Sequence, residues 1–155
     1  MANKLKDFIV TEAITLGMAA SSAEEVIRHL GGKLADAGYV RESFVEAVLE
    51  REKTIPTGLP LGGEYNVAIP HTDIEHVYKP GIGMATLTES VVFHNMVSPE
   101  ETVDVRLVFI LALDQPKSQI EMLQEIAGVL QNPQMVTELI NATDLRQVRE
   151  ALQKA

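Results

Sequence analysis

The longest apolar run in the sequence places the strongest constraint on the fold. Seven consecutive apolar residues, Leu107 to Leu113, end a segment that begins at Val103 and is rich in β-branched side chains. A strand that is apolar on both faces is typical of the centre of a sheet that other elements cover on both sides. We therefore expect Val103–Leu113 to be a central strand, whose neighbours can be shorter edge strands.

Weaker strand patterns precede this run. Gly83–Leu87 and Val91–Phe93 are rich in apolar and β-branched residues. Val67–Ile69 is predicted to be a short buried strand, which Pro70 interrupts because proline cannot donate to a strand ladder. The glycines and prolines between Thr54 and Gly63 predict a loop with tight turns.

Helical patterns lie before these strands. Ser22 and Glu25 form a capping box, and the apolar spacing that follows predicts a helix ending near Gly38. A second helix is predicted from Glu42 to Arg51, because the turn signal Pro56-Thr57-Gly58 stops it soon afterwards.

Helical patterns also follow the strands. Ser118 and Glu121 form another capping box, Pro133 begins a short helix, and Leu145–Leu152 is predicted to be a C-terminal helix. Helices on both sides of a strand cluster imply a single layered α/β domain, residues 1–155, with a central mixed sheet flanked by helices. The helix after Ser118 is predicted to bury the stripe Ile120, Leu123, Ile126, Ala127 and Leu130.

The composition excludes several functional classes. The chain has no cysteine, which removes disulfides, thiolate metal sites and cysteine nucleophiles. Its formal net charge of −9 opposes binding to nucleic acid or to an anionic membrane surface, because both depend on clustered lysine and arginine. The apolar run is far shorter than the ~20 residues that cross a membrane, and Met1–Asp7 lacks signal-peptide features, so we expect a cytoplasmic protein.

Histidine is the first candidate for covalent chemistry, because its side chain is neutral and nucleophilic near pH 7. Of the four histidines, His29 lies inside the first predicted helix at a solvated position, and His94 is predicted to be a turn residue. His71 follows a predicted buried strand directly, where an irregular backbone presents a side chain from a rigid scaffold. Local context alone also allows a structural or surface role for His71.

A metal site is the alternative for this segment, because His76 follows His71 by five residues, with Asp73 and Glu75 between them. Paired histidine ligands on a helix are three or four residues apart, whereas this segment is predicted to be a loop. No third ligand with clear spacing stands out, so the sequence disfavours a metal-dependent hydrolase.

Two segments together carry a family resemblance: Arg51–Gly58 (REKTIPTG) and Val67–His71 (VAIPH). In order and approximate spacing they resemble enzyme IIA of the fructose/mannitol superfamily of bacterial sugar phosphotransferase systems, although the stretch between them is slightly longer than in many members. The likeness extends over nearly the whole chain. It implies that His71 is the phosphoryl acceptor, that the Arg51 guanidinium lies beside the phosphoryl group, and that Thr57 is a nearby hydrogen-bond donor.

These implied roles agree with the chemistry of the residues. A neutral imidazole nitrogen attacks a phosphoryl group, and the resulting bond is labile enough to pass the group onward. The guanidinium of Arg51 presents a planar fork of donors to phosphoryl oxygens. A solvated helix end is the alternative for Arg51.

One position departs from the family pattern. Many members carry a second histidine just before the helix that follows the long central strand, and Gln119 stands there in this chain. With Ser118 as N-cap, Gln119 is predicted in the first helical turn, where free N–H groups favour an anion; an ordinary exposed glutamine is the alternative. The galactitol-like branch commonly lacks the second histidine, and the continuation Thr72–His76 is also closer to that branch.

The resemblance implies a phosphotransferase that accepts a phosphoryl group from phosphorylated HPr on His71 and passes it to a cysteine of enzyme IIB. The pair then drives uptake of a polyol or sugar through a membrane enzyme IIC, with no cofactor, metal or nucleic acid. A nitrogen-related regulatory module, controlled by phosphorylation of His71, is the alternative. Asp73 and Glu75 would repel a phosphoryl group, so we expect them to point outward.

Overall fold

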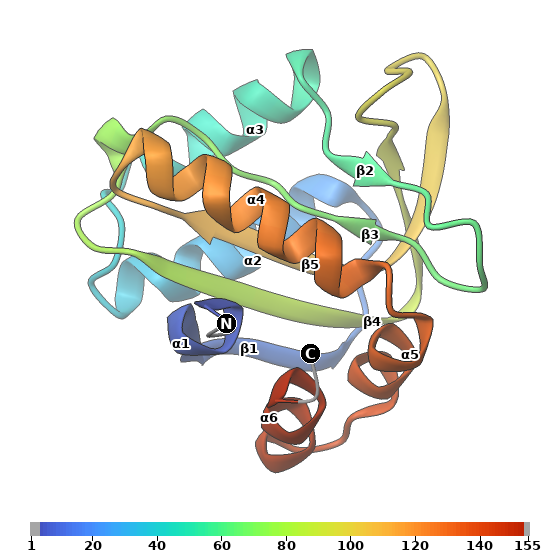
Figure 1. The fold of residues 1–155 in the computed structure, drawn as a ribbon. Helices are drawn as coiled ribbons and strands as arrows, with labels where there is room; N and C mark the ends of the chain where they lie inside the picture. Colours follow the sequence, from blue (N-terminus) through green and yellow to red (C-terminus); the bar gives the residue numbers. More distant parts are fainter. Residues whose placement is uncertain (1–3, 154–155) are drawn as a thin grey trace.

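The computed structural model describes residues 4–153. Five strands form one mixed sheet in the order β1-β4-β5-β3-β2, and helices cover both of its faces (Figure 1). This is the layered α/β fold that the sequence predicts. The strands are β1 (Ile9–Met18), β2 (Gly58–Leu59), β3 (Val67–Ala68), β4 (Gly81–His94) and β5 (Thr102–Ala112). The helices are α1 (Lys4–Phe8), α2 (Ala23–Asp36), α3 (Phe44–Thr54), α4 (Pro116–Leu130), α5 (Pro133–Asn141), α6 (Leu145–Gln153) and the short 3₁₀ helix η1 (Ile74–His76).

The long apolar run forms the central strand, as expected. β5 pairs with β4 in antiparallel and with β3 in parallel orientation. Side chains along a strand alternate between its two faces. Leu107, Phe109 and Leu111 pack against α1, α4, α5 and α6, whereas the residues between them pack against α2 and α3. Both faces of β5 are therefore buried, which explains why its sequence is apolar without alternation.

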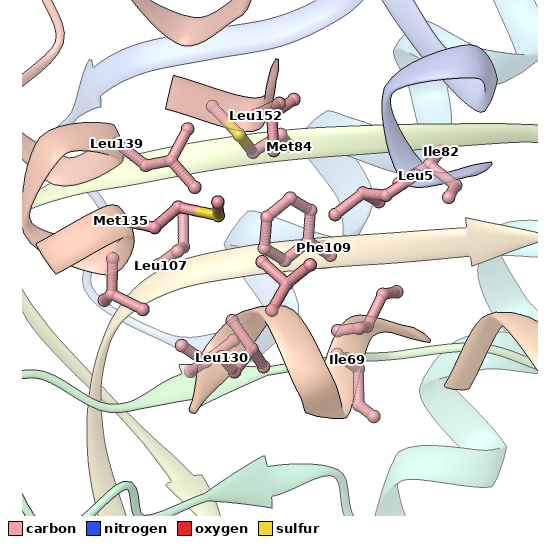
Figure 2. Packing of buried hydrophobic residues seen from close by; sticks show 14 of the residues in the cluster. Leu5, Ile69, Ile82, Met84, Leu107, Phe109, Leu130, Met135, Leu139 and Leu152 are labelled. Carbon is pink, nitrogen blue, oxygen red and sulfur yellow. The ribbon is translucent and has the colours of Figure 1, made fainter. Parts of the chain in front are cut away.

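Figure 2 shows the first of these clusters, where Phe109 lies among side chains from distant parts of the chain. Leu5 comes from α1 and Leu152 from α6, and both are buried against the sheet. Full burial of a side chain of this size stabilises the fold by roughly 1.5–3 kcal/mol. The first and last helices are thus integral parts of the core that supports β5.

The strand predictions need correction in several places. Gly83–Leu87 and Val91–Phe93 belong to one strand, β4, with a register shift where they join. β4 also pairs with β1, so the expectation that shorter edge strands flank the central strand is wrong for β4. Strand β1 was not predicted from the sequence, because the exposed residues Thr11 and Glu12 interrupt its apolar pattern.

The first long helix confirms its predicted start. The Ser22 hydroxyl accepts a hydrogen bond from the Glu25 amide at 3.2 Å, which caps α2. The helix ends at Asp36, and Gly38 adopts a φ of 84°, a conformation that glycine tolerates best. Helix α3 starts and ends slightly later than predicted and carries Arg51 in its last turn.

Helix α4 begins earlier than predicted. Pro116 is its first residue and Gln115 its N-cap, so Ser118 lies inside the first turn and the predicted capping box is wrong. Proline suits the first helical position, because its φ is already helical and no N–H is needed there. Helices α5 and α6 begin at Pro133 and Leu145, as the sequence predicts.

The apolar stripe predicted for α4 is only partly correct. Ile126 and Leu130 are buried, but Ile120 is 60% exposed and Ala127 is also exposed. The buried face of α4 instead includes Met122. Among the helices between residues 4 and 153, none combines the length and apolar character needed to span a membrane.

Candidate functional site

His71 lies in the irregular segment that follows β3. Pro70 ends the regular pairing, but its carbonyl accepts a hydrogen bond from the Leu111 amide of β5 at 3.0 Å, and His71 forms an isolated bridge with the same residue. The His71 residue is 8% exposed. The central strand therefore fixes the backbone at His71, while a small part of the residue stays accessible.

The ring of His71 has a defined orientation. Its Nδ1 lies 2.9 Å from the carbonyl oxygen of Ile69. A carbonyl oxygen only accepts hydrogen bonds, so Nδ1 carries the proton and donates it. In the neutral imidazole, Nε2 then keeps a free lone pair. This tautomer leaves Nε2 as the nucleophilic atom.

The surroundings of His71 also favour its neutral form. Burial lowers the pKa of His71 from its ordinary value of 6.5, and the positive charge of Arg51 lowers the pKa further. The hydrogen bond to Ile69 and the negative charge of Asp73 act in the opposite direction, but the net change is downward. His71 is therefore neutral, and its Nε2 unprotonated, near pH 7.

Arg51 presents an unused donor in this site. Its Nη1 donates to the Asp73 carboxylate at 2.9 Å, and its side chain is 31% exposed. Its Nε is buried and has no hydrogen-bond acceptor among residues 4–153. Buried donors rarely stay unpaired in folded proteins. A guanidinium with a free buried N–H is suited to bind an oxygen of an anion.

Asp73 does not follow its prediction fully. Its side chain is 66% exposed, as an outward position requires, but its carboxylate turns to Arg51. Glu75 is exposed, as expected. The ion pair was not predicted from the sequence. The available signal is that a carboxylate beside a candidate phosphoryl site needs a cationic neighbour, and Arg51 is the candidate cation there.

Thr57 is fully buried, and both of its donors have partners. Its hydroxyl and its backbone amide each donate to the Glu52 carboxylate at 2.8 Å. Its carbonyl accepts a hydrogen bond from the Ile69 amide at 3.2 Å. Thr57 thus connects α3 to the segment that carries His71. Its expected hydrogen bond to a phosphoryl group stays a prediction, since the hydroxyl would have to leave Glu52.

Glu52 has a role in the site that was not predicted from the sequence. Burial raises the pKa of its carboxyl group above the ordinary 4.5, although the hydrogen bonds from Thr57 and the charge of His94 lower it in part. The only available signal was a glutamate beside Arg51 in the family-like segment, which does not by itself indicate a contact with Thr57.

Gln119 lies next to the segment that carries His71. Its side-chain amide donates to the carbonyl of Thr72 at 2.9 Å. Because α4 begins at Pro116, the backbone amide of Gln119 already donates to the carbonyl of Gln115 at 3.0 Å. The expectation that Gln119 offers a free first-turn N–H is therefore wrong.

The other histidines have separate partners. His29 is half-buried, with Nε2 at 2.8 Å from the Thr15 hydroxyl, and so is less solvated than predicted. His94, at the end of β4, lies with Nδ1 2.9 Å from the carbonyl of Pro99. His76 lies with Nδ1 2.8 Å from the Ser43 hydroxyl. Within residues 4–153, no group of three or more histidine, aspartate or glutamate side chains could hold a metal ion.

Comparison with known proteins relates these features to a family. Residues 7–155 match the family model described as "Phosphoenolpyruvate-dependent sugar phosphotransferase system, EIIA 2". The galactitol-specific EIIA component of Escherichia coli (strain K12) is 31% identical over 124 residues, which cover 80% of this chain and 81% of that protein.

Two further relatives belong to mannitol systems. The mannitol-specific EIICBA component of Vibrio cholerae serotype O1 is 32% identical over 144 residues, or 91% of this chain, and the match covers 21% of that longer protein. A solved complex of enzyme IIA and phosphorylated enzyme IIB of the Escherichia coli mannitol system contains a chain that superposes on this protein with a TM-score of 0.77. The two sequences are 28% identical, and the match covers 95% of this chain and 98% of the solved chain.

Proposed function

We propose that this chain, which belongs to the EIIA 2 family of the phosphoenolpyruvate-dependent sugar phosphotransferase system, carries its phosphoryl group on His71. The observation behind this assignment is the ring geometry: Nδ1 is held by the Ile69 carbonyl, so Nε2 keeps its lone pair. The unpaired Nε of Arg51 supports the same assignment, because the site then offers both a nucleophile and a donor for phosphoryl oxygens.

Phosphoryl transfer at His71 takes place in two displacements. In the first, the Nε2 lone pair attacks the phosphorus atom of phosphorylated HPr. The bond between phosphorus and its donor atom breaks, and HPr keeps that electron pair. In the second, a cysteine thiolate of enzyme IIB attacks the same phosphorus, and the electron pair of the broken bond returns to Nε2. The proton stays on Nδ1, which donates it in the hydrogen bond to the Ile69 carbonyl throughout.

Arg51 stabilises the charge on the transferred group. The phosphoryl oxygens carry most of the negative charge in such a transfer, so positioning and electrostatic donors supply most of the catalysis. The guanidinium lies close enough for its charge to lower the pKa of His71. One amide hydrogen of Gln119 is donated to the Thr72 carbonyl, and the second can be donated to a phosphoryl oxygen. Unlike a second histidine, Gln119 carries no charge.

The partners follow from the same assignment. Enzyme IIB is the acceptor, and a solved complex of a related IIA with phosphorylated IIB supports this part of the proposal. HPr is the donor. A membrane enzyme IIC takes part indirectly, and the transfer occurs in the cytoplasm. The galactitol-specific relative and the lack of a second histidine favour a polyol of the galactitol kind as the transported substrate.

Intact-mass measurement after incubation with phosphoenolpyruvate, enzyme I and HPr tests the assignment. We expect one acid-labile phosphoryl group on the wild type and none on His71→Ala. If the group persists in His71→Ala, the nucleophile lies elsewhere. Transfer onward to a sugar-specific enzyme IIB separates the transport role from the regulatory alternative, which uses the same histidine without that transfer.

A further inference from the structure

Asp73 places a negative charge beside the candidate phosphoryl site. It follows His71 by two residues, and its carboxylate lies 2.9 Å from the Arg51 Nη1. Arg51 lies on α3, 22 positions before Asp73, so the fold brings these two residues together. Among residues 4–153, the Arg51 side chain has one ion-pair partner, and this partner is an anion two residues from the proposed nucleophile.

Both charges of this pair affect the pKa of the His71 imidazole. Arg51 lowers the pKa of His71 and Asp73 raises it, which means that the histidine experiences the two charges separately. A phosphoryl group on Nε2 brings a further charge of about −1.5 to −2 into the same space, as phosphoryl groups on other side chains do. Arg51 attracts this group, and the carboxylate of Asp73 repels it.

The phosphoryl group and Asp73 also compete for one guanidinium. Arginine holds a phosphoryl group best through two parallel N–H donors. Asp73 already occupies Nη1 of Arg51, whereas Nε has no acceptor among the described residues. A phosphoryl group that binds Arg51 through Nη1 must therefore share that nitrogen with Asp73 or displace it.

We propose that Asp73 is a tuning residue that weakens the hold of Arg51 on the phosphorylated histidine and so keeps the phosphoryl group transferable. This inference rests on the proposed function. A carrier that binds its phosphoryl group too tightly accepts it readily but releases it slowly. Asp73 limits that binding in two ways, by occupying a donor of Arg51 and by repelling the phosphoryl oxygens.

The test compares Asp73→Asn with a control variant, Glu75→Gln. The control removes an exposed carboxylate two residues further along the same segment. The measured quantity is the equilibrium division of phosphoryl groups between HPr and this protein, by intact mass. We expect Asp73→Asn to shift the equilibrium constant about fivefold toward the phosphorylated carrier, the size of a partly exposed charge interaction. Glu75→Gln should match the wild type, and Asp73→Glu, which restores the charge, should lie near it.

A second readout needs no phosphoryl donor. NMR titration of the unphosphorylated protein should give a lower pKa for His71 in Asp73→Asn than in the wild type, because the carboxylate raises that pKa. An unchanged or smaller phosphorylated fraction in Asp73→Asn would overturn the inference about Asp73. The proposed function is judged separately, and phosphorylation of His71 in the wild type upholds it. A wild type without phosphoryl on His71 overturns the proposed function itself.

Discussion

The carboxylate of Glu52 accepts both hydrogen bonds that Thr57 can donate, one from the backbone amide and one from the hydroxyl, each at 2.8 Å. Thr57 in turn accepts a hydrogen bond from the amide of Ile69, which lies two residues before His71. A single carboxylate near the end of α3 therefore connects that helix to the segment that carries the proposed nucleophile.

Removal of Glu52 should destabilise the fold measurably. In Glu52→Ala the buried hydroxyl and the backbone amide of Thr57 lose their acceptor. Each unsatisfied buried donor costs about 1–3 kcal/mol, so we expect the free energy of unfolding to fall by roughly 2–6 kcal/mol. Urea denaturation measures this loss. Glu50→Ala, on an exposed position of the same helix, is the control and should stay within about 0.5 kcal/mol of the wild type. Equal losses in both variants would contradict the role of Glu52.

The pH dependence of His71 follows from its lowered pKa. The folded protein binds this proton less readily than the unfolded chain, whose pKa is near 6.5. The contribution of this pKa difference to the stability of the fold is therefore complete above pH 6.5. It is lost as the pH falls through the lowered pKa of His71 in the folded state. We expect acceptance of a phosphoryl group from HPr to stay near its maximum at pH 6.5 and to decline only at lower pH. Initial rates across this pH range test the expectation, and a midpoint at or above 6.5 would contradict it.

Arg51 should affect transfer far more than stability. Loss of a single positioned donor in a transition state commonly slows a reaction by about 10²-fold, so we expect Arg51→Ala to slow phosphoryl transfer by roughly 10- to 100-fold. Arg51→Lys should also be slow, because lysine keeps the charge but not the planar fork. Arg146→Ala removes an exposed arginine from α6 and is the matched control. Wild-type rates in both Arg51 variants would remove this residue from the site.

Gly58 is required by a close approach of two backbone segments. A Cβ atom at this position would lie 2.6 Å from the carbonyl oxygen of His94, so the backbone of β2 or β4 would have to move. We expect Gly58→Ala to lower the free energy of unfolding by about 1–3 kcal/mol. At Gly63 a Cβ meets nothing within 4 Å, so Gly63→Ala should have little effect. Thermal or urea denaturation of the pair decides whether this contact is tight.

Local sequence signals predicted the parts of the molecule that depend on a single segment. The apolar run at Leu107–Leu113 predicts a strand buried on both faces. Successive side chains point to opposite faces of the sheet, so apolar residues at every position require both faces to be shielded from water. Ser22 and Glu25 predict a helix start, because both groups of the cap lie within one turn. In the same way, Pro70 and His71 predict an irregular strand end.

Contacts between distant segments were not predictable in this way. Arg51 and Asp73 come together only when α3 and the segment after β3 pack on the same sheet. At the start of α4, Pro116 and Ser118 are competing local signals, and tertiary packing is needed to choose between them. The edge strand β1 lacks the continuous apolar pattern of β5, because part of it faces solvent.

The hydrogen bond from the Leu111 amide to the Pro70 carbonyl bears on how the site moves. Amides in a central strand commonly exchange with solvent only when a whole domain opens, whereas surface loops open locally and often. The backbone next to His71 is hydrogen-bonded to such a strand. The geometry of the site should therefore persist between successive encounters with different proteins. If His71 carries the phosphoryl group as proposed, its donor and its acceptor meet the same rigid surface, and neither has to wait for a loop to close before transfer.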